Sequence, residues 1–332
     1  MTDYNTEYPQ KENRIIIIAG PTAVGKTAAA VRLAKMLDTE IISADSMQVY
    51  RGMNIGTAKA TAEEMAGVPH NLIDVVDFGE DYNVTRFQEM AAKETERIQK
   101  KGKIPVICGG TGFYIQALLY GMKFLEEERD REFREKLFQK AEKEGSRAVW
   151  QELEQTDPEY AAAVAPENLL KCIRALEFIH LHGIKFSDYN RQQTKRRENP
   201  VYDAKLFVLY DERKTIFEKI DRRVDRMMEQ GLLEETEALI RQGARKESTA
   251  MQAIGYRQLI EYIGGNKSLP EAIEEIKVLT HRYAKRQIVW FKREPSAIWI
   301  HTGLKEPVAE ITGYLWPDVR DAFRNSINGE EK

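Results

Sequence analysis

A glycine-rich loop near the start of the chain carries the first residue types that could do chemistry. The sequence GPTAVGKT follows the apolar run Ile15 to Ile18 and matches the pattern G-x-x-x-x-G-K-[ST]. In such a loop the backbone N–H groups turn towards phosphate oxygens, the lysine reaches the terminal phosphate, and the Thr hydroxyl can bind Mg²⁺. We therefore predict a phosphate site in which Lys26 supplies charge and Thr27 is the metal ligand. Its candidate residues are Gly20, Pro21, Thr22, Ala23, Val24, Gly25, Lys26 and Thr27.

Two further polar positions follow later strand candidates. Nucleoside triphosphatases and kinases with this loop usually carry a strand-end Asp that completes the metal site. Here the run Ile104 to Cys108 leads to a Gly-Gly-Thr sequence that ends at Thr111, whereas Asp45 follows the earlier run Glu40 to Ser43. Asp45 is therefore a candidate general base or acceptor ligand, although an Asp that caps the next helix would give the same local pattern.

Strands alternate with helical patterns around these positions. This alternation predicts an α/β fold, with a P-loop-containing parallel sheet flanked by helices. The strand candidates are Ile15 to Ile18, Glu40 to Ser43, Leu72 to Val76, Ile104 to Cys108 and, the only one after the middle of the chain, Ala204 to Tyr210. The helical patterns cover residues 27–37, 85–101, 213–241 and 269–292.

The middle of the chain has a different character. Residues 126–197 are charged and helix-forming, as in EEERDREFREKLFQKAEKEG, with almost no strand signal. We predict an all-helical insertion domain at 125–200 within a catalytic core formed by residues 12–124 and 201–310. Residues 311–332 are predicted to form a C-terminal tail, because the sequence after Gly303 carries little signal.

Composition limits the class of protein. The 332 residues are 42% apolar and 31% charged, which suits a globular protein, and no apolar run approaches the ~20 residues that span a bilayer. The polar start is unlike a targeting peptide, and Cys108 and Cys172 lack metal-ligand spacing, so we expect a cytoplasmic protein. With a net charge of −3, any RNA would be held by local basic patches. No interface signal is visible, so we expect a monomer without membrane contact.

Seven segments, in order along the chain, carry a resemblance to a known family. They are GPTAVGKT, ISADSMQVYRGMNIGTAK, VPHNLID, GGTGFYIQALLYG, RALE, GYRQL and AKRQIVWFKR, and they lie between Ile15 and Arg293. Together they resemble the tRNA dimethylallyltransferase, or isopentenyl-tRNA transferase, family. The resemblance implies that the loop holds dimethylallyl diphosphate and that ATP is not consumed. It further implies transfer of the dimethylallyl group to the exocyclic amino nitrogen of the adenosine immediately 3′ of the anticodon, in tRNAs that read codons starting with U, giving isopentenyladenosine and diphosphate.

The resemblance also implies roles for individual residues. Lys26, Arg223 and Mg²⁺ near Thr27 would stabilise the departing diphosphate. Asp45 would accept the proton of the amino group, and Thr111 would place a hydroxyl close to the adenine. The other partner is the tRNA anticodon stem-loop, whose target base must be splayed into a pocket. The candidate tRNA-binding residues are Asp45, Ser46, Met47, Gln48, Thr111, Arg134, Lys171, Arg174, Gln252, Gly255, Tyr256, Arg257, Arg282, Lys285 and Arg286.

Two departures from the family pattern leave questions open. The family commonly has Thr-Arg before AKRQ, whereas this chain has Thr280-His281-Arg282, so His281 either replaces the usual arginine contact or shifts it. The sequence KFLEEERD stands where the family often has a Pro-containing loop, which leaves the geometry of the insertion's hinge open.

Three other functions fit parts of the sequence. An adenylate prenyltransferase acting on free AMP or ATP would share the chemistry, but a mononucleotide does not need the long insertion with its basic residues. A small-molecule or nucleotide kinase is disfavoured because the strand-end metal Asp is missing. A non-catalytic RNA-binding protein would not need a complete phosphate loop together with Asp45.

Overall fold

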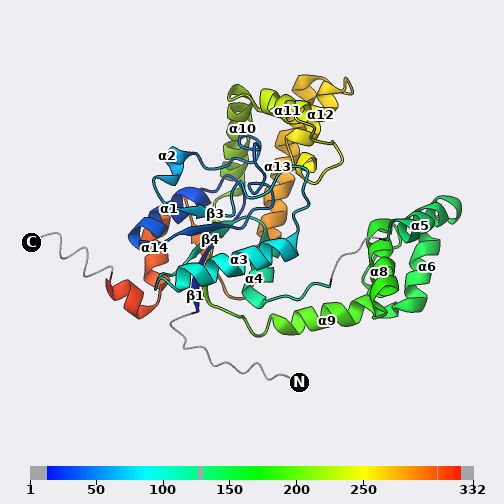
Figure 1. The fold of residues 1–332 in the computed structure, drawn as a ribbon, viewed down its shortest axis with the longest axis horizontal. Coiled ribbons are helices and arrows are strands. Elements are labelled where there is room, and N and C mark those ends of the chain that lie inside the picture. Colours follow the sequence, from blue (N-terminus) through cyan, green and yellow to red (C-terminus); the bar gives the residue numbers. More distant parts are fainter. Residues whose placement is uncertain (1–12, 126–129, 305, 323–332) are drawn as a thin grey trace, which may run out of the picture. The chain divides into compact units, whose positions relative to one another are not determined.

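The protein is described by a computed structural model that covers residues 13–125, 130–304 and 306–322 (Figure 1). Residue 12, residues 126–129 of the expected insertion and hinge, and residues 323–332 of the expected tail lie outside the described residues. The chain divides into two compact units. One combines Met1–Leu119 with Val201–Lys332, and the other is Tyr120–Pro200.

The first unit is built on a parallel sheet, which confirms the predicted α/β fold. Its described residues form six strands in the order β3-β2-β4-β1-β5-β6, and every neighbouring pair is parallel. Both faces are covered, so the central strands are continuous apolar runs; Ile15 to Ile18 have no exposed surface. The strands are β1 (Arg14–Ala19), β2 (Ile41–Ser43), β3 (His70–Asn71), β4 (Val106–Gly109), β5 (Asp203–Tyr210) and β6 (Ala297–His301).

Two strand expectations were wrong. Leu72 to Val76 do not form the expected strand: β3 is His70–Asn71, directly before them, and Val76 makes only an isolated bridge to Tyr50. Strand character also returns a second time after the insertion, because β6 pairs in parallel with β5. The β6 sequence AIWIH is β-rich but only five residues long, and it follows a long helix almost directly.

Helices connect the strands of this unit. The expected helix 213–241 is two helices, because Gly231 adopts a left-handed backbone with φ 96° between α10 and α11. The described helices are α1 (Lys26–Met36), α2 (Ala62–Met65), α3 (Val84–Gln99), α4 (Gly112–Tyr120), α10 (Arg213–Glu229), α11 (Leu232–Arg241), the short 3₁₀ helix Ala250–Gln252, α12 (Tyr256–Ile263), α13 (Leu269–Phe291) and α14 (Pro307–Tyr314).

The beginning of the expected C-terminal tail belongs to the core. Ile311, Leu315 and Trp316 are buried, and they join a hydrophobic cluster with residues of α1 and of the sheet. The Trp316 indole also donates to Asp203, and Arg14 donates to Asp318. Residues 311–316 therefore pack into the first unit rather than forming a separate tail.

The second unit contains helices and no strand in its described residues. They are α5 (Arg131–Glu144), α6 (Ser146–Thr156), α7 (Pro158–Ala162), α8 (Leu169–His182) and α9 (Phe186–Arg196). The unit has a hydrophobic core of its own, which includes Val149, Leu153, Cys172 and Ile173. Cys172 is thus a small apolar core residue.

A buried carboxylate ties β2 to α3. Glu40 is 8% exposed and accepts hydrogen bonds from Arg97, Lys101 and Asn71. The Arg97 guanidinium is the main cause that lowers the Glu40 pKa from 4.5 to about 2. Because the pKa of Glu40 is lower in the folded than in the unfolded protein, its ionised carboxylate stabilises the fold at pH values above about 4.5. This stabilisation is lost as the pH falls from about 4.5 towards 2.

We expect Glu40→Gln to lower the free energy of unfolding at pH 7 by about 2–3 kcal/mol, the order given by this pKa shift. Urea unfolding at pH 7 and pH 3 measures the effect, which should shrink at the lower pH because the carboxylate of the unfolded chain is then protonated, while the folded one, with its pKa near 2, is still ionised. Glu96→Gln, at an exposed position of the same helix α3, is the matched control. Equal losses for Glu40→Gln at both pH values would show that the ion pair is not the cause.

Candidate active site

The predicted catalytic residues lie at one edge of the sheet. The phosphate loop follows β1, Asp45 follows β2, and Thr111 follows β4. These three strands are neighbours in the order β2-β4-β1, with Ser43 opposite Cys108 and Ala19 opposite Gly109. Because all three run in parallel, their carboxyl ends meet at the same edge, where ligands bind in open α/β sheets.

The phosphate loop is shaped by close backbone packing. Gly20 has φ 141°, and a Cβ there would lie 2.4 Å from the Leu209 carbonyl oxygen of β5, so only glycine fits. Gly25, with φ 96°, leads directly into α1, so the first N–H groups of this helix face the loop. The arrangement is a ready-made anion site.

Two cations converge on this loop. The Lys26 ammonium donates to the Pro21 carbonyl at 2.7 Å, and burial lowers the Lys26 pKa from 10.5 to about 8. Arg223 of α10 lies 3.5 Å from the Thr22 hydroxyl, and burial lowers its pKa as well. Both groups lose hydration without a carboxylate partner at hydrogen-bond distance in the described residues, which is the environment that a bound anion would stabilise.

A pocket of about 300 Å³ beside the loop extends this positive site. It is lined by Ala23, Lys219, Arg222, Arg223 and Arg226. The four cations come from one side of α10, at spacings of three and four residues. Sequence reasoning selected Arg223 and missed its three neighbours, although the regular spacing of basic residues in KIDRRVDR was visible.

Gln287 of α13 joins the phosphate loop to the Gly110-Thr111 turn. It is buried; its Oε1 accepts from the Thr22 N–H at 2.8 Å, and its Nε2 donates to the Gly110 carbonyl at 2.9 Å. A Cβ on Gly110 would lie 2.1 Å from this Nε2, so an alanine there would displace the Gln287 amide. Gln287 was not selected from the sequence, although it lies in the AKRQ segment.

The Asp45 carboxylate is held by its own loop. Its Oδ1 accepts from the backbone N–H groups of Met47 at 2.8 Å and Gln48 at 3.2 Å, which leaves Oδ2 as the oxygen that can take a proton. The Gln48 amide donates to the Thr57 and Ala58 carbonyls. Asp45 thus caps a local turn, and the same turn fixes its orientation.

Thr111 lies beside this carboxylate, together with a tyrosine that the sequence prediction missed. The Thr111 Oγ1 is buried and makes no hydrogen bond of normal geometry within the described residues, although the Tyr283 phenol lies close to it. Burial, and then the Asp45 charge, raise the pKa of Tyr283. Asp45 also lies close enough to Lys26 to raise the Lys26 pKa slightly. The base candidate and the anion site are therefore adjacent.

The tRNA-binding candidates on α13 form an exposed basic face. Arg282, Lys285 and Arg286 are exposed at spacings of three and four residues, and the Arg286 guanidinium lies 5.8 Å from the centre of the Tyr283 ring. His281 instead stacks on Phe217 of α10, with ring centres 4.0 Å apart. In this structure His281 therefore packs inside the unit rather than joining the exposed cations.

Two of the other tRNA-binding candidates are buried. Gln252 and Arg257 are exposed, but Gly255 is buried and Tyr256 has no exposed surface. The prediction that Gly255 and Tyr256 contact RNA is therefore not supported in this structure, and the Tyr256 phenol donates to Glu235 instead.

In the helical unit, the three candidates lie in different surroundings. Lys171 and Arg174 are exposed on α8, whereas Arg134 of α5 forms a 2.7 Å ion pair with Glu177 of α8. This pair links two helices of the unit, so part of the Arg134 side chain has a structural role.

A metal site made only of protein side chains is absent from the described residues, since no cluster of three or more His, Cys, Asp or Glu could hold an ion there. The half-buried Thr27 at the start of α1 remains the candidate ligand. A single hydroxyl fits Mg²⁺, which is usually bound through substrate phosphates and water with few protein ligands. No helix in the described part of the chain is long and apolar enough to cross a membrane.

Comparison with known proteins points to one family. Residues 48–294 match the IPP transferase family, and residues 13–77 match a second family described as isopentenyl transferase. A tRNA dimethylallyltransferase of Shouchella clausii is 46% identical over 91% of this chain and 95% of its own. The Bacillus subtilis tRNA dimethylallyltransferase is 43% identical, over 89% and 91%.

Solved structures agree with this match. The full-length tRNA isopentenylpyrophosphate transferase of Bacillus halodurans is 37% identical, with a TM-score of 0.69, over 96% of this chain and all of that one. A eukaryotic dimethylallyltransferase acting on tRNA is 27% identical, with a TM-score of 0.75, over 90% and 77% of the two chains. The chain therefore belongs to the IPP transferase family of prenyltransferases.

Proposed function

We propose that the protein transfers the dimethylallyl group of dimethylallyl diphosphate to the exocyclic amino nitrogen of an adenosine in the tRNA anticodon loop, immediately 3′ of the anticodon. The observation that carries this proposal is the position of Asp45 next to a phosphate loop that Lys26 and Arg223 make strongly positive. A site for a leaving diphosphate and a base for the acceptor thus share one sheet edge. Relatives named for this reaction support the proposal.

The chemistry uses the two halves of the site in different ways. An adenine amino group is a poor nucleophile, because its lone pair is delocalised into the ring, so the allylic carbon must be made strongly electrophilic. Lys26, Arg223 and the loop N–H groups stabilise the diphosphate as its C–O bond breaks. A new N–C bond forms, and the amino proton passes to Asp45 Oδ2. Thr111 and Tyr283 lie near Asp45 and are proposed to hydrogen-bond the acceptor.

Mg²⁺ is proposed as the cofactor, with Thr27 as its protein ligand. When bound, it would neutralise charge on the leaving diphosphate and so complement the two cations.

The acceptor is proposed to be an anticodon stem-loop rather than a free nucleotide. Arg282, Lys285 and Arg286 present an exposed basic face on α13, and Arg257 adds charge on α12. Such a face suits the phosphates of a structured RNA, whereas AMP carries only one phosphate. tRNAs that read codons starting with U are the proposed acceptors.

A direct test compares these acceptors. Purified protein, Mg²⁺ and dimethylallyl diphosphate are incubated with an unmodified anticodon stem-loop or with AMP, and the nucleosides are identified by mass spectrometry. We expect prenylated adenosine only in the RNA, at the position 3′ of the anticodon. A stem-loop with guanosine at that position is the control. Preferential prenylation of AMP would favour the adenylate prenyltransferase alternative.

A further inference from the structure

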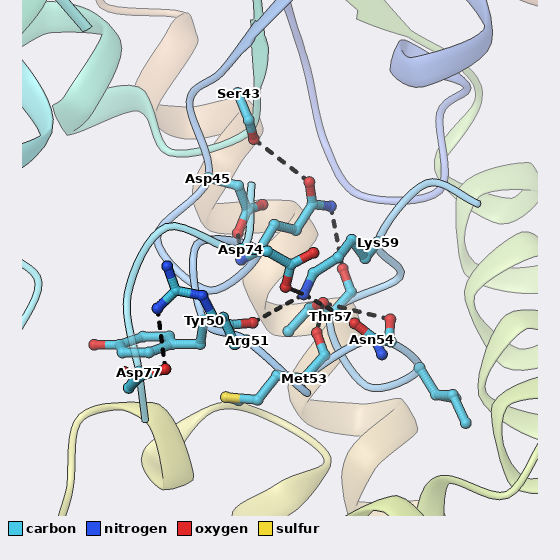
Figure 2. A network of polar contacts seen from close by, with 12 residues as sticks. Ser43, Asp45, Tyr50, Arg51, Met53, Asn54, Thr57, Lys59, Asp74 and Asp77 are labelled. Carbon is cyan, nitrogen blue, oxygen red and sulfur yellow. Dashed lines mark hydrogen bonds and ion pairs between the residues drawn. The ribbon is translucent and has the colours of Figure 1, made fainter. Parts of the chain in front are cut away.

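The loop that follows Asp45 is held in shape by side chains rather than by a helix or strand. We call residues 45–59 the acceptor loop. Besides the Gln48 contacts, the Lys59 ammonium donates to the Tyr50 carbonyl at 2.8 Å, to Asn54 Oδ1 at 2.9 Å and to Asp74 at 2.6 Å (Figure 2). The Lys59 side chain is only 5% exposed. These bonds tie the two ends of the loop to each other.

The outer bend of the acceptor loop is fixed by one carboxylate from a distant helix. Glu235 of α11 accepts from the N–H groups of Asn54 at 3.0 Å, Ile55 at 2.9 Å and Gly56 at 3.2 Å. The Tyr256 phenol of α12 donates to the same carboxylate at 2.6 Å. Three consecutive amides around one anion form a concave nest, and such charge-assisted bonds are about twice as strong as neutral ones.

The backbone at Gly56 packs tightly against the Tyr256 ring. Tyr256 is fully buried, and a Cβ on Gly56 would lie 2.5 Å from its ring. Gly56 therefore lies directly on the Tyr256 ring, and its amide has little room to turn away from Glu235.

We propose that Glu235 is a positioning residue of the transfer reaction. With Tyr256, it holds the acceptor loop in the one shape that presents Asp45 and Gln48 to the adenine. The bend at Asn54 to Gly56 is connected to the active site through Thr57 and Ala58, whose carbonyls hold the Gln48 amide. This inference rests on the proposed function, because it takes Asp45 to be the base.

The test compares Glu235→Gln with Glu234→Gln, which changes an exposed glutamate at the preceding position of α11. A glutamine amide would direct an N–H₂ group at the backbone donors, so the nest loses at least one bond and its charge. We expect amide hydrogen exchange of the acceptor loop to rise about tenfold or more, the order expected for losing bonds to a charged group. The single-turnover transfer rate should fall by about the same factor, whereas the affinity for dimethylallyl diphosphate should stay within about twofold of wild type.

Tyr256→Phe tests whether both residues act through one clamp. It removes only the phenol hydroxyl, so we expect a smaller rate loss than for Glu235→Gln. In the double variant the losses should not multiply, because residues that share an interaction are coupled.

The outcomes separate positioning from general stability. A folded Glu235→Gln protein whose acceptor-loop amides exchange at the wild-type rate, and whose transfer rate is that of the wild type, would overturn the proposal. The proposal would also fail if hydrogen exchange rose as much in β1 as in the acceptor loop and affinity for dimethylallyl diphosphate fell as much as the transfer rate. Failure of the proposed function is distinguishable, because wild-type protein would then not prenylate RNA at all. The hydrogen-exchange comparison would still report on the clamp in that case.

Discussion

Replacement of Asp45 by Asn is expected to slow transfer by about 10²- to 10⁴-fold, the usual contribution of a positioned general base. Asn keeps an oxygen that can accept from the Met47 and Gln48 N–H groups, so the acceptor loop should retain its shape. It cannot take the proton of the adenine amino group. The loss should therefore appear in the rate of the chemical step and not in the binding of either substrate.

Single-turnover transfer and separate binding titrations with the stem-loop and the donor measure this split. Asp77→Asn is the matched control, since Asp77 is exposed and pairs at 3.0 Å with Arg51 of the acceptor loop. A rate for Asp45→Asn within a few-fold of wild type would remove Asp45 from the role of base. An equal loss of RNA affinity would point to a role in binding.

Lys26→Met is expected to have the second large effect. The Lys26 ammonium is directed into the phosphate loop, and removing one preorganised stabiliser of a leaving anion typically costs about 10²- to 10³-fold in rate. Methionine keeps a long apolar stem without the charge. We therefore expect weaker binding of inorganic diphosphate as well as slower transfer. Lys35→Met, on the exposed side of the same helix α1, should change neither.

The lowered pKa of Lys26 gives this prediction a pH signature. Because burial lowers that pKa to about 8, wild-type affinity for diphosphate should fall as pH rises through about 8, and Lys26→Met should not show this fall. In the unfolded chain the Lys26 ammonium keeps its proton up to about pH 10.5. The buried charge therefore destabilises the fold at low pH, and this cost disappears as the pH rises from about 8 to about 10.5. A flat wild-type profile from pH 7 to 9 would contradict the assignment.

The sequence alone predicted the features that depend on local pattern. The phosphate loop, the sheet with its flanking helices, and the acid after β2 all arise from short contiguous segments, and the structure confirms a parallel sheet flanked by helices. Contacts between distant segments were missed for a physical reason. Gln287 meets Thr22 and Glu235 meets Asn54 only after folding, so no local spacing indicates either pair.

The other differences have a similar origin. Tyr256 was selected as part of the run Gln252 to Arg257, but an amphipathic helix buries one side, and the sequence did not show that this side includes Tyr256. The segments β6 and α14 are short and lack strong periodicity, and they are stabilised by packing on β5 and on α1, respectively. Tertiary contacts therefore stabilise these two elements, for which the local sequence signal is weak.

The central claim is that the phosphate loop holds a leaving group rather than a nucleoside triphosphate to be hydrolysed. One reaction that contains the stem-loop, Mg²⁺, dimethylallyl diphosphate and ATP tests it directly, with prenylated adenosine, diphosphate and inorganic phosphate followed together. We predict that diphosphate and prenylated adenosine appear in equal amounts while ATP stays intact. RNA-stimulated release of phosphate from ATP without prenylated adenosine would contradict the claim.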